Sequence, residues 1–276
     1  MDGRDPASFR DPSGHIYHLN GRILRTVAHR AVPGYERVRD TGLLRKWIDA
    51  GRVVDTTEVP VSELSVEGPE PAYLLEHARI PFISWPYEWP FAALKAAALL
   101  HLDLQIEALA RDVQLSDATA CNVQFDGARP VFIDVLSFVP YREGDYWMGH
   151  RQFCEQFLNP LLLRALCGVP HNAWLRGSPE GITATELNAV LPAARKVSWN
   201  VFSQVTLPAR VDRAGGASPA RAGQKPRPPL KRFAYRGLLA QLRGWIARLE
   251  PRGHTRTTWS DYETSHTYAD AEHRAK

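Results

Sequence analysis

The stretch from Asp117 to Asp134 constrains the fold more than any other part of this chain. Asp117 is separated by four residues from Asn122, and two short apolar runs then flank the dipeptide Asp126-Gly127. Asp-Gly favours a tight turn because glycine adopts positive φ without strain, so the two runs are predicted to form a β-hairpin. The second run ends at Asp134, and the hairpin therefore returns that carboxylate to the neighbourhood of Asn122.

Two carboxylates and one amide at a single place suit phosphoryl transfer to a hydroxyl group. In that chemistry one aspartate accepts or orients the substrate proton, an asparagine binds Mg²⁺, and a second aspartate holds Mg²⁺ against the phosphates of ATP. We therefore predict Asp117 as the catalytic base, and Asn122 and Asp134 as ligands of Mg²⁺, an ion that prefers oxygen donors. The alternative interpretation is structural, since Asp and Asn form turns and a strand-terminal Asp caps the loop that follows it.

The remainder of the chain predicts short strands and amphipathic helices. Residues 16–27, interrupted by Asn20-Gly21, are predicted to form another hairpin. A long helix is predicted from Pro90 to about Arg111, because apolar residues recur at helical spacing after a proline that the first turn tolerates. Further helices are expected over residues 35–51 (interrupted at Gly42), 151–167, 183–191 (capped by Thr183 or Thr185) and 235–249, and further strands over residues 53–54, 59–64 and 72–80.

These features together resemble the protein-kinase-like superfamily, in particular small-molecule kinases of the aminoglycoside-phosphotransferase and lipopolysaccharide-kinase sort. Their catalytic loop has D-x-x-x-x-N, an apolar strand, a turn, and an apolar strand that ends in Asp, which here are Asp117, Asn122, VQF, DGARP, VFI and Asp134. The resemblance implies an α+β, protein-kinase-like fold. A small β-rich N-lobe is expected over residues 14–80 and a mainly helical C-lobe, carrying the catalytic-loop hairpin, over residues 81–207.

The chain departs at three places from the pattern of active members of that superfamily. Leu115-Ser116 precedes the first aspartate where His-Arg or His-Gly is common, and no glycine-rich phosphate loop precedes a strand. No lysine occupies the strand position that contacts phosphate; Arg25 is the basic residue nearest to that place, with Glu36 or Glu58 as its expected partner. Arg does not replace a phosphate-binding Lys freely. An inactive scaffold that retains the two acids and the amide is therefore a second interpretation.

A longer resemblance extends over most of the chain. The segments WPYEWPFAALKAAALLHLDLQIEAL, SDATACNVQFDGARPVFIDVLSF and GHRQFCEQFLNPLLLRALCGVPHNAWLRG resemble the N-terminal region of bacterial class I SAM-dependent methyltransferases, including nodulation-protein relatives. The resemblance implies a methyltransferase domain beyond residue 276, preceded by a C-terminal helical segment over residues 233–276. SAM is expected only in that downstream domain, because residues 1–276 contain no strand followed by the glycine-rich acidic loop that SAM binding requires.

Positive charge is concentrated in one segment. The chain has a net charge of +4, yet 12 Lys or Arg residues lie between Pro208 and Thr258, where the acidic residues are Asp212 and Glu250. The rest of the chain is therefore acidic, which disfavours nucleic acid as a partner. Residues 208–232, rich in Pro, Gly, Ala and Arg, are predicted to be a basic flexible linker. Attraction of this segment to an anionic membrane surface or to nucleic acid is the alternative.

The remaining features bear on cellular location. Residues 1–13 are polar, lack the apolar core of a secretory signal and are predicted to be disordered. No apolar stretch reaches the roughly 20 residues that cross a bilayer, so we expect a cytoplasmic protein with no transmembrane segment. The three cysteines form no CxxC pair, which argues against a zinc or disulfide framework.

The leading hypothesis from the sequence is a kinase-like N-terminal domain of a SAM-dependent methyltransferase-type protein that serves substrate recognition or scaffolding. The first alternative is an active ATP- and Mg²⁺-dependent small-molecule kinase. The second is a binder of anionic surfaces or nucleic acid through the Arg-rich segment. Any enzymatic activity is expected to be that of a transferase, and the sequence does not identify its substrate.

Overall fold

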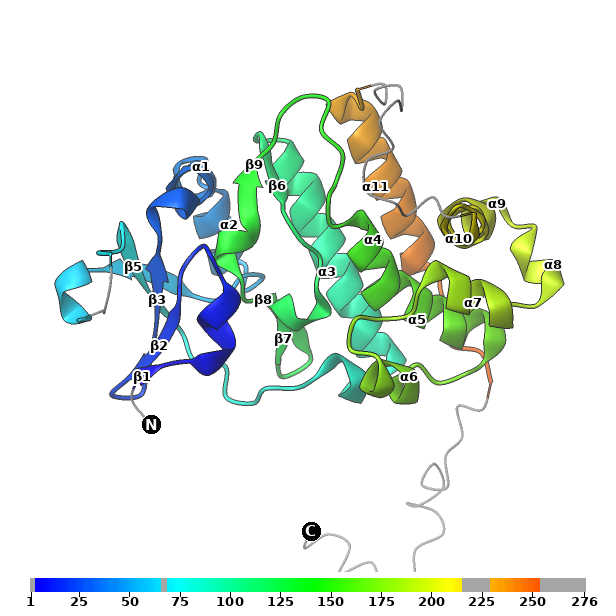
Figure 1. Ribbon diagram of the computed structural model, residues 1–276, viewed down its shortest axis with the longest axis horizontal. Coiled ribbons are helices and arrows are strands. Elements are labelled where there is room, and N and C mark those ends of the chain that lie inside the picture. Colours follow the sequence, from blue (N-terminus) through cyan, green and yellow to red (C-terminus); the bar gives the residue numbers. More distant parts are fainter. Residues whose placement is uncertain (1–2, 66–68, 215–228, 254–276) are drawn as a thin grey trace, which may run out of the picture.

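The computed structural model describes residues 3–65, 69–214 and 229–253. The architecture is mixed α+β, with a small antiparallel sheet at one end of the molecule and most of the helices at the other (Figure 1). A long helix, α3 (Phe91–Leu109), lies between the two parts. The predicted α+β class is therefore confirmed.

The sheet contains five strands in the order β1-β2-β3-β5-β4, and every neighbouring pair is antiparallel. The predicted Asn20-Gly21 turn joins β2 to β3, with φ of 50° and 78°. Because directly paired residues share a face of a sheet, Ile23, Arg25 and His77 lie on the same side. The strands are β1 (Gly3–Arg4), β2 (Ile16–Leu19), β3 (Arg22–Val27), β4 (Thr56–Val59) and β5 (Tyr73–His77).

Two helices lie between β3 and β4, namely α1 (Val32–Asp40) and α2 (Leu43–Asp49). Gly42 separates them with φ of 74°, a left-handed conformation that favours glycine, so the predicted interruption is confirmed. Trp47 of α2 is fully buried and stacks on Phe138, with ring centroids 4.9 Å apart. This contact joins α2 to the chain that follows the second hairpin.

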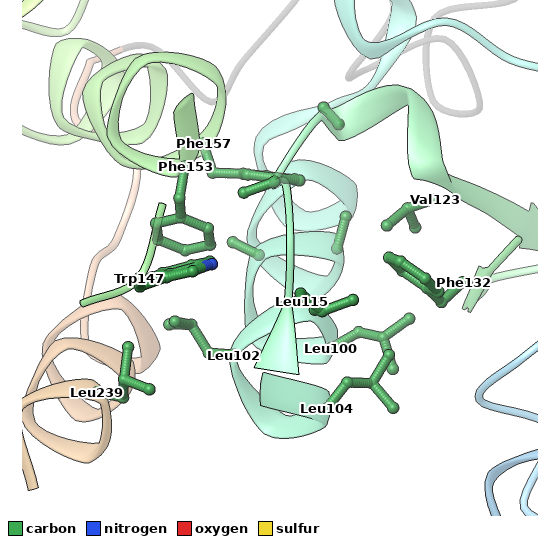
Figure 2. Packing of buried hydrophobic residues seen from close by; sticks show 14 of the residues in the cluster. Leu100, Leu102, Leu104, Leu115, Val123, Phe132, Trp147, Phe153, Phe157 and Leu239 are labelled. Atoms are coloured by element: carbon green, nitrogen blue, oxygen red, sulfur yellow. The ribbon is translucent and has the colours of Figure 1, made fainter. Parts of the chain in front are cut away.

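Helix α3 is buried along most of its length, which explains why its sequence is apolar nearly throughout. Helix α11 (Arg232–Ala247), the last helix of the described residues, packs along it. Gln105 Nε2 donates a hydrogen bond to the Tyr235 hydroxyl at 2.9 Å, and Arg243 forms an ion pair with Asp103. Figure 2 shows leucines of α3 among aromatic side chains of the neighbouring helices and of the hairpin.

The hairpin predicted after Asn122 is present, and its second strand is tied to the sheet-containing part of the molecule. Val54 N donates a hydrogen bond to Phe132 O at 2.9 Å, and Phe132 N donates one to Arg52 O at 2.9 Å. These bonds fix the end of the hairpin, and hence the position of Asp134. The strands of this region are β6 (Val113–Leu115), which pairs with β9 (Phe138–Pro140), and β7 (Val123–Asp126), which pairs with β8 (Arg129–Phe132).

Most of the remaining helices lie on the side of α3 away from the sheet (Figure 1). Residues 150–167 form one continuous helix of alternating α- and π-helical turns. Thr183 Oγ1 accepts a hydrogen bond from Glu186 N at 3.2 Å, and Thr183 N donates to the Glu186 carboxylate at 2.8 Å, so the cap predicted at Thr183 is confirmed. The helices are α4 (His150–Phe153), α5 (Asn159–Leu162), α6 (Asn172–Gly177), α7 (Ala184–Val190), α8 (Ala193–Lys196), α9 (Trp199–Val201) and α10 (Leu207–Arg213), with short 3-10 helices such as η1 (Pro6–Arg10), η3 (Val61–Glu63), η5 (Ala120–Asn122) and η6 (Val135–Ser137), and a π-helical turn, η9 (Phe202–Thr206).

Two segments predicted to lack structure are ordered where the structure describes them. Residues 3–13 form β1 and a short 3-10 helix, because β1 adds to the edge of the sheet and Asp11 pairs with Arg25. Residues 208–213, predicted as linker, belong to helix α10, where Ala209 is fully buried. Polarity and proline content predicted disorder at both places, and tertiary contacts overrode them.

Other expectations are shifted or lie beyond what the structure describes. The strand predicted over residues 59–64 is wrong, because β4 ends at Val59, before Pro60, which has no N–H to donate to a strand ladder. Residues 215–228 of the predicted linker and residues 254–276 of the predicted C-terminal segment lie outside the described residues. Among the helices that are described, none has both the length and the apolarity to cross a membrane.

Candidate active site

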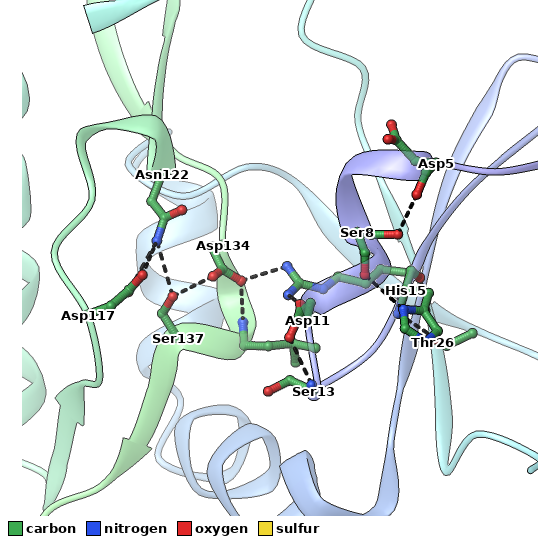
Figure 3. Close-up of polar contacts among 12 residues, drawn as sticks. Asp5, Ser8, Asp11, Ser13, His15, Thr26, Asp117, Asn122, Asp134 and Ser137 are labelled. Atoms are coloured by element: carbon green, nitrogen blue, oxygen red, sulfur yellow. Dashed lines mark hydrogen bonds and ion pairs between the residues drawn. The ribbon is translucent and has the colours of Figure 1, made fainter. Parts of the chain in front are cut away.

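The structure brings Asp117, Asn122 and Asp134 together (Figure 3). Asn122 Nδ2 lies within hydrogen-bonding distance of both Asp117 carboxylate oxygens, at 3.2 and 3.3 Å, and of Ser137 Oγ, at 3.3 Å. Ser137 Oγ in turn donates to Asp134 Oδ2 at 2.5 Å. The two acids and the amide therefore form one connected network, while their catalytic and metal-binding roles stay predictions.

Local structure explains how this network forms. Asn122 ends the short helix η5 immediately before β7, and Asp134 follows β8 by two residues, so the hairpin places them side by side. Asp134 also caps η6, because its Oδ1 accepts a hydrogen bond from Leu136 N at 3.2 Å. That helical turn brings Ser137, three residues after Asp134, back to the same carboxylate.

Arg25 is the residue that links this network to the sheet. Its side chain is 8% exposed, and its guanidinium donates to Asp134 Oδ1 at 2.6 Å and to Asp11 Oδ2 at 2.5 Å. The partners predicted for Arg25 are wrong. Glu36 accepts a hydrogen bond from the Tyr73 hydroxyl, and Glu58 accepts hydrogen bonds from the Tyr35 hydroxyl and from Arg39, so both glutamates are engaged elsewhere.

Sequence reasoning missed two members of the cluster. Asp11 was overlooked because residues 1–13 were predicted to be disordered, and only the folded sheet edge places it beside Arg25. Ser137 was not among the predicted site residues, whereas the structure shows it as a hydrogen-bonding bridge. Its position three residues after a capping Asp134 was the available signal, since such residues share one helical turn.

The two carboxylates differ in their electrostatic environment. Burial raises the pKa of Asp117, and the negative charge of Asp134 raises it further. Burial alone also raises the pKa of Asp134, but the Arg25 guanidinium and the Ser137 hydroxyl outweigh it and lower that pKa. Asp134 is therefore the carboxylate that stays charged, and Asp117 is the better proton acceptor of the two.

A buried histidine supports the loop that carries Asp117. His101 of α3 is fully buried, and its ring lies 5.7 Å from that of Trp147 and 5.8 Å from that of Phe132. Burial lowers the pKa of His101 to about 3, and the backbone of Asp117 partly opposes this shift. His101 is therefore neutral at physiological pH. The sequence alone did not single out His101 as a neighbour of the site.

A cleft of about 650 Å³ lies beside the cluster, between the sheet and residues 78–83. His77 lines it and is 8% exposed; its Nδ1 lies 2.9 Å from Thr56 Oγ1, and its Nε2 has no hydrogen-bond partner among the described residues. Burial and, to a smaller extent, the charge of Arg25 together lower the pKa of His77 to about 4. Ile133, directly before Asp134, also lines the cleft. The cleft is thus large enough for a ligand and opens next to the charged cluster.

The donor types at this site suit Mg²⁺, but their arrangement does not. Both oxygens of Asp134 are engaged, one by Arg25 and Leu136 N and the other by Ser137 Oγ. A Mg²⁺ ion at Asp134 competes with the Arg25 guanidinium for the same carboxylate. Within the described residues, no group of three or more His, Cys, Asp or Glu side chains is placed to hold a metal ion.

Comparison with known proteins finds one similar curated protein and a similar solved structure. No family model matches the chain. It is 41% identical over 267 residues to nodulation protein NoeA of Rhizobium meliloti (strain 1021). The match covers 96% of this chain and 56% of NoeA, so the chain spans little more than half the length of that relative. Among solved structures, vaccinia related kinase 3 matches with a TM-score of 0.37 and 13% identity, over 89% of this chain and 81% of that protein.

Proposed function

We propose that this chain is a kinase-like recognition domain of a methyltransferase-type protein, in which the cleft beside Asp134 binds a substrate or nucleotide without transferring a phosphoryl group. The observation that carries the proposal is the buried Arg25 guanidinium, which pairs with Asp134 and Asp11. A carboxylate that is already neutralised by a fixed internal cation is poorly available to a metal ion.

The methyltransferase part of the proposal concerns the longer protein. The similarity to NoeA bears on it only through length, because the match covers 56% of that relative and leaves room for a further domain. We place methyl transfer, and SAM binding, in a domain after residue 276. Residues 14–80 and 81–207 then serve as the two halves of the recognition domain.

The test is nucleotide binding and turnover by the full chain. We expect no ATP turnover at millimolar Mg·ATP, and a nucleotide affinity, where binding is seen, that does not change when Mg²⁺ is removed with a chelator. Asp126→Ala is the matched control, because Asp126 is an exposed carboxylate at the tip of the same hairpin whose partner is Arg129. Mg²⁺-dependent turnover that is lost in Asp117→Asn and Asp134→Ala but kept in Asp126→Ala contradicts the proposal.

That contrary result supports the second candidate function, an active small-molecule kinase with Asp117 as base. The specific observation in its favour is the raised pKa of Asp117 beside Asn122. Arg25→Met separates the two functions. It removes the internal cation, so the recognition domain is expected to gain affinity for Mg²⁺ at Asp134, measured by titration calorimetry. An active kinase is expected to lose ATP turnover instead.

The third hypothesis, attraction of the Arg-rich segment to anionic surfaces or nucleic acid, stays a prediction. Several of its basic residues pair within the protein: Arg243 with Asp103, and Arg232 with Asp112 and Glu143. These pairs lower the positive charge available to a partner. Binding to anionic vesicles that is lost when residues 215–228 are deleted is the result that supports this hypothesis.

A further inference from the structure

A second cavity, of about 420 Å³, lies on the far side of the candidate active site from the sheet. It is enclosed between α11, the chain around α9 and the loop that precedes α4. Its most prominent feature is a set of aromatic rings: Tyr146, Trp147, Trp199, Tyr235 and Trp245. We call this space the aromatic cavity. Its volume is in the range of small-molecule sites in proteins.

The sequence of α11 explains one wall of the aromatic cavity. Leu239 and Ile246 are buried on the side of this helix that joins the core. Leu238, Gln241 and Trp245, spaced by three and four residues, line the cavity on the adjacent side. Leu238 is 56% exposed, so this stripe is only partly covered by the rest of the protein.

The opposite wall carries neutral hydrogen-bonding groups. Asn200, Ser203 and Gln204 line the cavity from this side, and Gln241 does so from α11. Ser203 Oγ donates to the Asn200 backbone oxygen at 3.2 Å, and the Asn200 side-chain amide has no hydrogen-bond partner among the described residues. Among the described residues no Asp, Glu, Lys or Arg lines the cavity.

This composition restricts the ligand. An ion is disfavoured, because moving a charge into a space without a counter-charge is costly. A pure hydrocarbon is disfavoured as well, because it covers the amides of Asn200 and Gln241 without offering them a hydrogen-bond partner. Trp199, whose ring stacks on that of Phe202, and Trp245 both line the cavity, so an apolar ligand surface can pack against their rings. The ligand must therefore present an apolar face and an edge of uncharged donors and acceptors.

We propose that the aromatic cavity binds an uncharged saccharide ring, whose C–H face stacks on the indole rings and whose hydroxyl groups bond to the amides. Trp199 lies at the rim with 70% of its surface exposed, so its ring is accessible to a ligand in the cavity. This site goes beyond the proposed function, because it needs neither nucleotide nor metal.

The cavity also touches the loop of the candidate active site. Trp147 forms part of its lining, and a methyl group added at Gly149 lies 2.8 Å from both Trp147 Nε1 and the backbone carbon of Asp117. A glycine is therefore required where the cavity wall meets the Asp117 loop. A saccharide in the cavity sits one side-chain layer from that loop.

The experiment is saturation-transfer NMR on the full chain with neutral disaccharides, maltose and cellobiose, at millimolar concentration. Indole and tetramethylammonium serve as the apolar and the cationic probes. We expect saturable binding of at least one disaccharide, and weaker or no binding of the two probes. Trp199→Ala is expected to lower the affinity for the disaccharide by about tenfold or more. Gln241→Leu is expected to lower the same affinity, because a hydrogen bond to the ligand is lost.

Both variants replace exposed side chains, so folding is retained and is checked by circular dichroism. Trp85→Ala is the matched control, since Trp85 is 50% exposed and lies in the connection before α3, away from the aromatic cavity; we expect it to bind disaccharide normally. The proposal is overturned when neither disaccharide binds, when indole or tetramethylammonium binds in preference to both, or when Trp199→Ala and Gln241→Leu bind as the wild type does.

Discussion

The charged cluster next to the cleft and the aromatic cavity satisfy their polar groups in opposite ways. In the charged cluster, Arg25 pairs with both Asp134 and Asp11. In the aromatic cavity the polar groups are neutral, and the amides of Asn200 and Gln241 face the open space. A ligand that binds Asp134 must compete with bonds that stabilise the fold, whereas a ligand of the aromatic cavity adds bonds that the fold lacks. The difference predicts how each region responds to substitution.

The largest effect is expected from Arg25→Met. The substitution leaves two partly buried carboxylates without their cation, and the free energy of unfolding is expected to fall by about 3 kcal/mol. Urea denaturation at neutral pH measures it. Arg129→Met is the control, because both side chains of the Arg129–Asp126 pair are more than half exposed, and its effect is expected to stay below about 0.5 kcal/mol. If the two variants lose the same free energy of unfolding, the buried ion pairs of Arg25 are no more stabilising than the surface pair of Arg129, which contradicts this prediction.

The next effect concerns His101, which lies between the two regions and contacts Trp147. Its folded-state pKa of about 3 lies below the ordinary value of 6.5, so between these values the unfolded chain binds a proton that the folded chain does not. Stability is therefore complete above pH 6.5 and is lost as pH falls, by up to about 1.4 kcal/mol per pH unit.

Replacing His101 with Leu is expected to remove this contribution, so that the loss of stability between pH 7 and 5 becomes smaller by about 2 kcal/mol. Urea denaturation of both proteins at the two pH values measures it. A wild type and a His101→Leu variant that lose the same stability on acidification show that this histidine is not the group that resists protonation.

Ser137→Ala tests the bridge inside the charged cluster. The variant leaves Asp134 Oδ2 without its hydroxyl donor, so we expect a loss of about 1 kcal/mol and a rise in the pKa of Asp134 toward its ordinary value. Because that pKa is lowered in the folded protein, the stability it contributes is lost at a higher pH in the variant during acid titration. Ser203→Ala, in the wall of the aromatic cavity, is the hydroxyl control, and its acid titration is expected to match that of the wild type.

The smallest effect is expected from Gln241→Leu in the aromatic cavity. Its amide is exposed and makes no hydrogen bond among the described residues, so the free energy of unfolding is expected to change by less than about 0.5 kcal/mol. Thermal denaturation measures it. A large loss of stability in this variant would show that Gln241 stabilises the fold, as the charged cluster does, and would contradict the proposed difference between the two regions.

Local sequence patterns predicted the elements near the candidate site well. The two turns, Asn20-Gly21 and Asp126-Gly127, are where their composition placed them, because positive φ at glycine is a local property. The long helix is present as α3, with bounds within a few residues of the prediction. Asp117, Asn122 and Asp134 come together because a short hairpin is itself a local structure.

Partners distant in the sequence were not predictable in the same way. Arg25 was expected to pair with Glu36 or Glu58, but it pairs with Asp134, 109 residues away, and with Asp11 in a segment taken to be disordered. The aromatic cavity likewise joins residues near 147, 199 and 245, which no periodicity connects. On α11, helical spacing does not show which apolar side chains are covered, and packing buries Leu242 while it leaves Leu238 56% exposed at the cavity.

Short-range interactions thus specify the hairpins, the helices and the local gathering of two acids and an amide, because glycine conformation and apolar spacing act within a few residues. Tertiary packing decides two other features. The edge of the sheet determines whether the two acids are paired with a cation, and the packing of α11 determines which cavity adjoins the loop that carries Asp117. The physical reason is burial. A charge that is removed from water needs a partner inside the protein, whereas a neutral polar group at a cavity can remain available to a ligand.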